Sequence, residues 1–584
     1  MCGIIGYIGK NVESVILDGL ERLEYRGYDS AGLAVCRQGN IQSFKAVGEV
    51  SKLKRTVKFC DDFGIGIGHT RWATHGAISL ENCHPHFSQS GDTALVHNGI
   101  IENFEDIKAQ LSGMQYYGQT DSEVAAKLIG DKLSISSLRK MIKKIAGSFA
   151  FAAISKGGDS IYFAKQKSPL YIAKKDDGVM LASDPSCFAG FSNEYISLDD
   201  GEYGRVSISN LTIYDSNDKI LQKQPQKLDF KFVDEEKKGY AHFMLKEIYQ
   251  SRLTLENIIE KYSGSQMQEV LSQIKSLNFD RIFLIGCGTA YHAALIGQYY
   301  LRQAFCIDIY AAVASELQNE CLPIDESSLC IFISQSGETA DTLAALEYCR
   351  EKGGKIVSIT NTIYSTMAQK SDFCLPLCAG QEKAVASTKA YFAQCLILYI
   401  FTLFLQRKDY ITSLKTFKNQ IDYGDDFALG EIADFISKYQ KVFFIGRGVD
   451  LITAKEASLK LKEITYIFSS AESSGELKHG VIALVDENLP VIVIATDEHL
   501  FKKTLNNAHE IKSRGGKLIL FTTLNIDDDT AACFDKVIKA NSAQKPLLPL
   551  QIIIQLQKLA YFTAVKLGNN PDKPRNLAKS VTVE

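Results

Sequence analysis

The sequence has little of what marks several large classes of protein. Positive and negative residues nearly cancel, at 65 Lys and Arg against 68 Asp and Glu, a formal charge of −3. No global field therefore attracts nucleic acid or an anionic membrane, and any phosphate specificity must come from a local pocket. The longest apolar run, Cys395 to Leu405, is interrupted by Thr402 and too short to cross a bilayer. The start, MCGIIGYIGK, lacks a basic region and a cleavage site. We expect a cytoplasmic protein that binds neither nucleic acid nor membrane.

Cysteine pairs at metal-binding or redox spacing are also missing. The 14 cysteines are scattered without a C-x-x-C motif, and the nearest approach is Cys374-x-x-x-Cys378. Twelve of them have apolar or strand-like neighbours, where a free thiol behaves as a small hydrophobic group. We expect no disulfide framework, no metal and no organic cofactor. Cys2 stands apart from the rest.

The pattern of predicted strands and helices changes near residue 220. Before it, short strand-like segments alternate with Gly-rich turns, and helical patterns occupy 12–23 and 121–129. Residues 221–243 are polar and charged, which is typical of a linker. After it, long helical patterns alternate with strongly apolar strands, which predicts α/β units on parallel sheets.

The second part contains an internal repeat. DRIFLIGCG (280–288) matches QKVFFIGRG (440–448), and LCIFIS and LPVIVIA follow at corresponding places. The next helices both end in Gly-Gly-Lys and lead to KIVSIT and KLILFT. This register predicts two copies of one doubly wound parallel-sheet domain, at 244–415 and 430–570, with a tail at 571–584.

Cys2 follows the initiator methionine, and its removal would give Cys2 a free α-amine. A thiol with a reference pKa near 8.5 beside such an amine combines a nucleophile with its own general base. Taken alone, a second-position cysteine is more often unremarkable.

Three segments at strand-to-loop transitions support the catalytic interpretation: GHTRWATHG, HNGIIEN and QTDSE. Arg71 has the planar fork that suits an α-carboxylate, and Asp121 the charge that suits an α-ammonium. Asn98 and the backbone N–H of Gly99 could form an oxyanion hole. Together these groups indicate hydrolysis of a free amino-acid side-chain amide, glutamine or asparagine.

These motifs, with LEYRGYDSAG and HPH, resemble the class II (N-terminal nucleophile) glutamine amidotransferase domain. The resemblance implies a layered α/β/β/α domain over 1–220, with Cys2 as nucleophile. It also implies that Arg71 and Asp121 anchor glutamine, while Asn98 and Gly99 are oxyanion donors. Four synthase families share this domain, so it does not by itself define the product.

In the first copy of the repeat, CIFISQSGET ends a strand and opens a helix. Ser334, Ser336 and Thr339 place hydroxyls beside N–H groups at a helix N-terminus, which favours an anion. An ordinary serine-rich helix cap is the alternative, and Glu338 argues against phosphate unless its side chain turns away. The second copy has ATDEHL at this place and has lost the hydroxyls, so we expect only the first to bind phosphate.

The second copy and the tail contribute different groups. Glu456, Lys460 and Glu463 share one helical face, either as a solvated stripe or with Glu463 as a general base supported by Lys460. His479 lies in a Gly-bounded loop and by itself is more often structural. Lys579 could form a Schiff base only if the tail folds into a pocket that tunes its amine.

The whole chain resembles the glutamine–fructose-6-phosphate aminotransferase family, the glucosamine-6-phosphate synthases, through SQSGETADT, VASTKA, LKLKEI, GELKHG and NLAKSVTVE in that order. The resemblance implies a homodimer that uses glutamine and fructose 6-phosphate. Lys579 would form the imine, Glu463 would move a proton between C1 and C2 with Lys460 assisting, and His479 of a neighbouring subunit would open the ring. Trp72 would gate ammonia passage between the sites. The implied sugar-phosphate pocket is lined by Thr289, Ser334, Gln335, Ser336, Thr339, Val385, Lys460 and Ala578, with Ser387 nearby.

Two positions depart from the family pattern. Ala290 stands where a serine is usual, which removes one sugar-contacting hydroxyl, and Val481 replaces a proline after GELKHG. Two alternatives stay open: an enzyme that uses the same domains on another sugar phosphate, as amidotransferase or deglycase, and a sugar-phosphate sensor that binds without turnover.

Overall fold

The structure is a computed structural model that describes residues 2–228 and 236–581. The chain divides into two compact units, Met1–Asp234 with Ser580–Glu584, and Glu235–Lys579. Within the described ranges, none of the helices combines the length and apolar character needed to cross a membrane.

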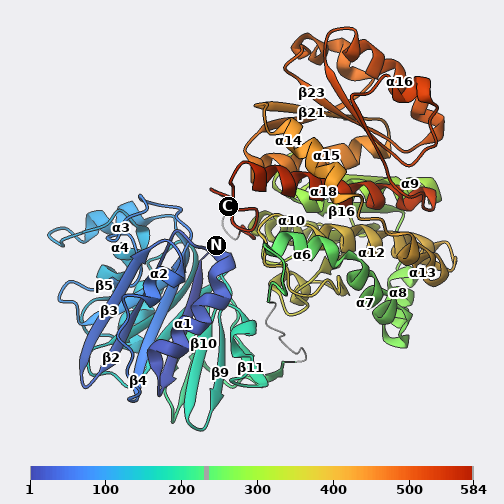
Figure 1. Cartoon of the computed structure of the whole chain (residues 1–584). Coiled ribbons are helices and arrows are strands. Elements are labelled where there is room, and N and C mark those ends of the chain that lie inside the picture. Colours follow the sequence, from blue (N-terminus) through green and yellow to red (C-terminus); the bar gives the residue numbers. More distant parts are fainter. Residues whose placement is uncertain (1, 229–235, 582–584) are drawn as a thin grey trace. The chain divides into compact units, whose positions relative to one another are not determined.

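The first unit is built on two antiparallel sheets (Figure 1). The eight-stranded sheet has the order β15-β11-β9-β10-β1-β4-β2-β3 and the seven-stranded sheet the order β14-β13-β12-β8-β7-β6-β5. The strands are β1 (Gly3–Gly9), β2 (Ser30–Arg37), β3 (Asn40–Val47), β4 (Gly64–Arg71), β5 (His86–Phe87), β6 (Thr93–Ile101), β7 (Gly147–Ser155), β8 (Ile161–Gln166), β9 (Tyr171–Lys175), β10 (Gly178–Ala182), β11 (Glu194–Ser197), β12 (Tyr203–Val206), β13 (Leu211–Tyr214), β14 (Ile220–Leu221) and β15 (Gln226–Lys227).

Alternation along the strands separates this unit into layers. In β1, Ile4 and Ile8 join the core between the two sheets, while Ile5 and Tyr7 join the core under α1 (Val12–Leu23). The outer face of the other sheet packs on α4 (Asp121–Ile129). The predicted α/β/β/α arrangement is confirmed, as are the two predicted helices. The remaining helices are η1 (Glu24–Arg26), α2 (Val50–Lys54), α3 (Phe104–Gln110), α5 (Ile135–Ile142) and η2 (Pro185–Phe188).

The second unit holds two parallel sheets with equivalent strand orders, β17-β16-β18-β19-β20 and β22-β21-β23-β24-β25. Both copies begin their first helix at a glycine with positive φ, 54° at Gly288 and 56° at Gly448. The repeat predicted from sequence is confirmed. The strands are β16 (Arg281–Gly286), β17 (Asp308–Val313), β18 (Ser328–Ser334), β19 (Lys355–Thr360), β20 (Phe373–Pro376), β21 (Lys441–Gly446), β22 (Phe468–Ser473), β23 (Pro490–Ala495), β24 (Lys517–Thr522) and β25 (Lys536–Lys539).

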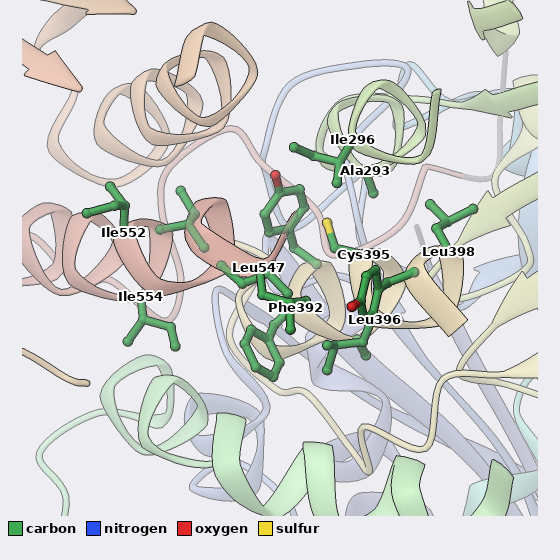
Figure 2. Close-up of a cluster of buried hydrophobic side chains, with 14 of the residues drawn as sticks. Ala293, Ile296, Phe392, Cys395, Leu396, Leu398, Leu547, Ile552 and Ile554 are labelled. Atoms are coloured by element: carbon green, nitrogen blue, oxygen red, sulfur yellow. The ribbon is translucent and has the colours of Figure 1, made fainter. Parts of the chain in front are cut away.

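Three long helices, α9 (Thr289–Ala304), α12 (Lys389–Leu405) and α18 (Leu548–Lys566), share one hydrophobic core, and α9 also packs on α15 (Val449–Thr465) of the second copy. Figure 2 shows side chains of all three converging, among them Ile296, Phe392 and Ile552. The long apolar run of the sequence is the interior of α12, where 14 of 17 residues are buried, so its composition reflects burial in protein.

The other helices of this unit range from single 3₁₀ turns to α15, which at 17 residues is as long as α12. They are α6 (Phe243–Tyr249), α7 (Ser251–Ser263), α8 (Ser265–Ser276), η3 (Ala314–Glu316), α10 (Ala340–Glu351), α11 (Thr366–Gln369), α13 (Tyr410–Gln420), α14 (Asp426–Ile436), α15 (Val449–Thr465), η4 (Glu476–His479), η5 (Val481–Leu484), α16 (Glu498–Lys512), α17 (Asp528–Ala531) and η6 (Lys545–Leu547).

The predicted linker, 221–243, includes the short edge strand β15, which pairs with β11 of the first unit. Its residues 229–235 lie outside the described part of the chain, as do residues 582–584 of the predicted tail.

Candidate active sites

Cys2 lies at the start of β1, where the pairing of Gly3 with Thr70 brings it beside the end of β4. The backbone N–H of Trp72 donates to the Cys2 thiol at 3.4 Å, and the thiol donates to the carbonyl of Trp72 at 3.6 Å. Burial raises the pKa of the Cys2 thiol, although the Trp72 N–H and the Arg71 charge act in the opposite direction. The thiol therefore needs a base nearby in order to act as a nucleophile.

The two predicted glutamine anchors, Arg71 and Asp121, are both buried. Both lie near Cys2, where the charge of Arg71 lowers the pKa of the thiol and that of Asp121 raises it. Arg71 ends β4, and its guanidinium donates to the carbonyls of the loop at 75–77, at 2.5 Å for His75. Asp121 opens α4, and its carboxylate accepts from the backbone N–H groups of Ile101 and Ser122, each at 2.8 Å. A cation and an anion thus converge on the thiol, as binding an amino acid requires.

Gly99 is fixed by its surroundings on β6. Its φ is 125°, and a Cβ at this position would lie 2.1 Å from the carbonyl oxygen of Ser148. Only glycine fits there. Asn98, the adjacent residue, is buried. The geometry is compatible with the predicted pair of oxyanion donors.

Sequence reasoning gave no role to four buried histidines behind this strand. His69 bonds the carbonyl of His97 at 2.9 Å, the N–H of His97 donates to His84 at 3.3 Å, and the His69 and His84 rings stack at 3.8 Å. His86 bonds Thr120, the cap of α4, at 3.0 Å. Burial lowers the pKa of all four, to about 3 for His69, so they are neutral scaffolding that holds the strand of Asn98 and Gly99.

The second site is a cavity of about 170 Å³ in the second unit. All nine residues predicted for sugar-phosphate binding line it, together with Glu463 and Lys579. They come from the loop after β16, the loop after β18, the segment before α12, the helix α15 and the tail. The lining residues are Cys287, Thr289, Ala290, Ile333, Ser334, Gln335, Ser336, Thr339, Thr342, Val385, Ser387, Gln394, Lys460, Glu463, Leu577, Ala578 and Lys579.

The serine-rich turn after β18 presents hydroxyls to this cavity. Ser334 Oγ lies 3.1 Å from Thr339 Oγ1 and accepts from the N–H of Gly337 at 3.1 Å. A Cβ on Gly337, whose φ is 67°, would lie 2.0 Å from the Ser365 hydroxyl. Glu338, whose charge would oppose phosphate binding, does not line the cavity. Its carboxylate accepts from the N–H of Thr366 at 2.8 Å.

On this face of α15, Glu456 and Lys460 are buried and Glu463 is half-buried, so the solvated-stripe interpretation is wrong. Lys460 Nζ lies 2.5 Å from Glu463 and 3.6 Å from Glu456, and donates to Thr289 at 3.0 Å. Burial opposes the charge on Lys460, but Glu463 and Glu456 outweigh it and raise the pKa of its ammonium. Glu456 also accepts from Thr289 at 3.1 Å and pairs with His292 at 2.7 Å. The α15 face therefore positions the Lys460 ammonium and the Glu463 carboxylate at the cavity.

A Schiff-base role for Lys579 requires the tail to fold into a pocket, and it does: the Lys579 side chain is only 2% exposed. Its ammonium pairs with the buried carboxylate of Glu382 and donates to the carbonyl of Ala384 at 2.8 Å. Glu382 was missed from sequence, where it is one of many acidic residues.

His479 does not line the cavity of its own chain. It is exposed on η4, next to the substituted Val481 on η5. Ala290 lines the cavity, as the family pattern implies for its position.

Comparison with known families defines the class of protein. A model of the glutamine amidotransferase domain matches residues 69–190, and the SIS domain model matches 277–403 and 435–565. An amidotransferase domain is thus followed by two sugar-isomerase-type domains.

Curated relatives match along the full length. Glutamine–fructose-6-phosphate aminotransferase (isomerizing) of Fusobacterium nucleatum is 39% identical over 609 residues, and that of Pyrococcus horikoshii 39% over 606, each covering 100% of both chains. The chain belongs to the glutamine–fructose-6-phosphate aminotransferase (isomerizing) family.

Solved structures match the second unit. The C-terminal domain of glucosamine-fructose-6-phosphate aminotransferase from Francisella tularensis is 32% identical with a TM-score of 0.53, covering 58% of this chain and 100% of that chain. Tagatose-6-phosphate ketose/aldose isomerase from Escherichia coli has a TM-score of 0.50 at 17% identity, covering 59% of this chain and 98% of that chain, which shows a shared fold.

Proposed function

We propose that this chain hydrolyses glutamine at Cys2 and transfers the nitrogen to fructose 6-phosphate, giving glutamate and glucosamine 6-phosphate. The observation that carries the proposal is the convergence of five distant segments on one cavity, which brings a hydroxyl cluster, a carboxylate and a lysine together. The family membership supports the same reaction.

At the amide site, the Cys2 sulfur attacks the side-chain carbonyl carbon of glutamine. Its proton passes to the α-amine that removal of Met1 exposes, and then to the departing ammonia. Asn98 and the N–H of Gly99 stabilise the oxyanion, while Arg71 and Asp121 hold the two ends of the amino acid. Water then hydrolyses the thioester, which releases glutamate and restores the thiol.

At the sugar site, the hydroxyls of Ser334, Ser336 and Thr339 hold the phosphate at the start of α10. The Lys579 amine forms an imine at C2 of the open-chain sugar with loss of water, and ammonia then replaces the lysine. Glu463 carries a proton from C1 to C2, which converts the ketose skeleton to the aldose. The sum consumes fructose 6-phosphate and ammonia and yields glucosamine 6-phosphate and water.

Two further elements belong to the proposal. His479 opens the sugar ring from a neighbouring subunit of a homodimer, which agrees with its exposure in the single chain. Ammonia passes between the sites through an apolar channel gated by Trp72, because in water the amine would be protonated and lose its lone pair.

The experiment is to measure glutamate and glucosamine 6-phosphate together, in the unaltered chain and in Cys2→Ala. We expect equal amounts of the two products, and loss of glutamate release in the variant with isomerisation of fructose 6-phosphate retained. Glutaminase activity that persists without Cys2 refutes the nucleophile assignment.

The same assay addresses the alternatives. Faster amination of another sugar phosphate would indicate a different synthase or a deglycase, and binding without either product would indicate a sensor. The retention of the nucleophile, the carboxylate and the lysine at their sites favours the enzyme.

A further inference from the structure

Glu247 is a buried carboxyl group on α6 that the proposed reaction leaves without a role. It accepts from two consecutive backbone N–H groups, that of Lys383 at 2.5 Å and that of Ala384 at 3.3 Å. These residues are 136 and 137 positions away along the chain. Glu247 therefore holds the turn formed by residues 382–385.

That turn supplies both partners of the Lys579 ammonium. Glu382 pairs with it, and the carbonyl of Ala384 accepts from it at 2.8 Å. Glu382 is fixed at the start of α12, because the N–H groups of Thr388 and Ala390 donate to it at 2.9 and 3.1 Å. Both partners of Lys579 are therefore next to a backbone N–H that Glu247 holds: Glu382 precedes the N–H of Lys383, and the Ala384 carbonyl belongs to the residue whose own N–H is bonded.

The turn is also tied to the tail. The N–H of Val385 donates to the carbonyl of Asp572 at 3.0 Å. The carboxylate of Asp572 in turn accepts from the N–H groups of Phe243 and Met244 at the start of α6, at 2.9 and 2.8 Å. The helix of Glu247, the turn and the tail of Lys579 form a closed frame.

Charge in this frame is unevenly distributed. Burial and the neighbouring Glu382 raise the pKa of Glu247 to about 8. Burial opposes the charge of Glu382 as well, but Lys579 and the backbone N–H groups lower its pKa. Glu247 is therefore the protonated member of the pair at neutral pH, and Glu382 is the carboxylate that pairs with Lys579.

The groups that face Glu247 come from each packed element. They are Glu382 and Lys383 in the turn, Lys389 at the start of α12, and Lys579 in the tail. From α18, which packs on α6, the polar groups include Tyr561, which is bonded to His242 at 3.0 Å, and Lys558, which lies over the ring of Tyr249 on α6 and pairs with Asp426.

We propose that Glu247 is a positioning residue for the Lys579 amine, acting through the turn at 382–385. As a neutral carboxyl it fixes Glu382 and the Ala384 carbonyl so that they orient the amine towards the cavity. Glu382 then takes the ammonium proton as the lone pair attacks C2 and water leaves. Ionised, Glu247 adds a second negative charge that retains Lys579 as ammonium, which cannot attack. This inference rests on the proposed imine chemistry.

The test compares Glu247→Gln, Glu247→Ala and the unaltered full chain between pH 6.5 and 9.5. The readouts are borohydride trapping of a fructose 6-phosphate adduct and the kcat and KM of isomerisation. Glu256→Gln, an exposed position on the neighbouring helix α7, is the control for loss of one negative charge. Glutaminase activity checks the first unit, and circular dichroism checks folding.

We expect trapping by the unaltered chain to fall above pH about 8, by up to about tenfold per pH unit, as one ionising group requires. A lone lysine would show the opposite trend, because its free amine increases with pH. Glu247→Gln should match the unaltered chain at pH 7 and lose the alkaline fall. Glu247→Ala should lower kcat at least about tenfold, with a smaller change in KM.

An alkaline fall that persists in Glu247→Gln overturns the inference, as does an unchanged rate in Glu247→Ala. If Glu247→Ala does not fold, the comparison of the unaltered chain with Glu247→Gln decides the question. An unaltered chain that forms product but never a trapped adduct overturns the proposed imine as well. Trapping without the predicted Glu247→Gln behaviour overturns only the role of Glu247.

Discussion

The two copies of the α/β repeat have the same strand order and the same glycine at the start of their first helix, but their pockets differ. The first copy has the cavity of about 170 Å³ with Ser334, Ser336 and Thr339. At the equivalent place after β23, the second copy has a cavity of about 890 Å³, lined among others by Val449, Asp497 and Leu500. The strand registers align Ser336 with Asp497, so the second copy has a carboxylate where the first has a hydroxyl.

Each copy lends a helix to the pocket of the other. Helix α15 of the second copy brings Lys460 to the first cavity, and α9 of the first copy brings Tyr300 to the second. These positions are 160 residues apart and equivalent in the repeat. In the second cavity Asp497 is paired with Lys545 at 3.1 Å, and the Tyr300 hydroxyl donates to the carbonyl of Pro546 at 2.8 Å. The fold is a shared scaffold, and the chemistry depends on a few side chains at its loops.

The largest expected effect comes from Lys579. The described part of the tail that carries it lines the first cavity and contributes nothing to the lining of the second. We expect Lys579→Ala to lower product formation by about 10³-fold or more and to abolish borohydride trapping, because Lys460, the other lysine of this cavity, is held as an ammonium by Glu456 and Glu463. The rate of glucosamine 6-phosphate release measures the effect. Lys566→Ala, an exposed lysine on α18, is the matched control and should leave the rate unchanged. An adduct that survives in Lys579→Ala would place the imine elsewhere.

Transferring the carboxylate of the second copy into the first is the next largest change. Ser336→Asp should raise the KM for fructose 6-phosphate about 100-fold, since it places a negative charge beside the phosphate. The reciprocal variant, Asp497→Ser, should leave KM unchanged. Steady-state kinetics at fixed glutamine separates the two, and equal effects of both variants would contradict the asymmetry of the pockets.

A smaller effect is expected where Thr289 in the first copy corresponds to Val449 in the second. Thr289→Val keeps the shape but removes the hydroxyl that joins Glu456 and Lys460. Loss of hydrogen bonds to charged groups costs about 1.5 kcal/mol, or roughly a tenfold loss in kcat/KM. Unchanged kinetics would show that Lys460 is positioned without the threonine.

The last effect is on stability and leaves catalysis unchanged, and it concerns Asp450, which stands where the first copy has Ala290. Burial raises its pKa to about 6, although Thr496 donates two hydrogen bonds to it. The native state therefore keeps a proton that the unfolded state releases, so the stability from this group is lost as pH rises from about 4 to about 6.

We expect Asp450→Asn to remove this contribution, up to about 1.4 kcal/mol per pH unit within that interval. Urea unfolding of the unaltered chain and the variant at pH 4.5, 5.5 and 6.5 measures it. Parallel stability curves for the two proteins would show that Asp450 is ionised throughout.

Much of the local structure was predictable because it follows from short-range patterns. The helices at 12–23 and 121–129 have the predicted bounds, and the apolar strands of the repeat lie where their sequences indicate. The predicted sugar-phosphate residues share one cavity. Their short motifs stand at strand ends, which adjacent parallel strands bring to the same edge of the sheet.

The α15 face shows where sequence reasoning stopped. Its spacing placed Glu456, Lys460 and Glu463 on one side of a helix but left open whether that side met water. Helix α9 of the other copy excludes water from this side, because its Thr289 and His292 cover Glu456.

By itself the sequence determined the elements, the repeat and the residues that bear the chemistry, since hydrophobic period and glycine position act over a few residues. Only the tertiary structure decided the charge state and surroundings of those residues. Glu382 meets Lys579 across 197 positions, and the four buried histidines of the first unit are neutral because other strands exclude water from them. Desolvation and charge pairing depend on distance in space, and no local pattern encodes that distance.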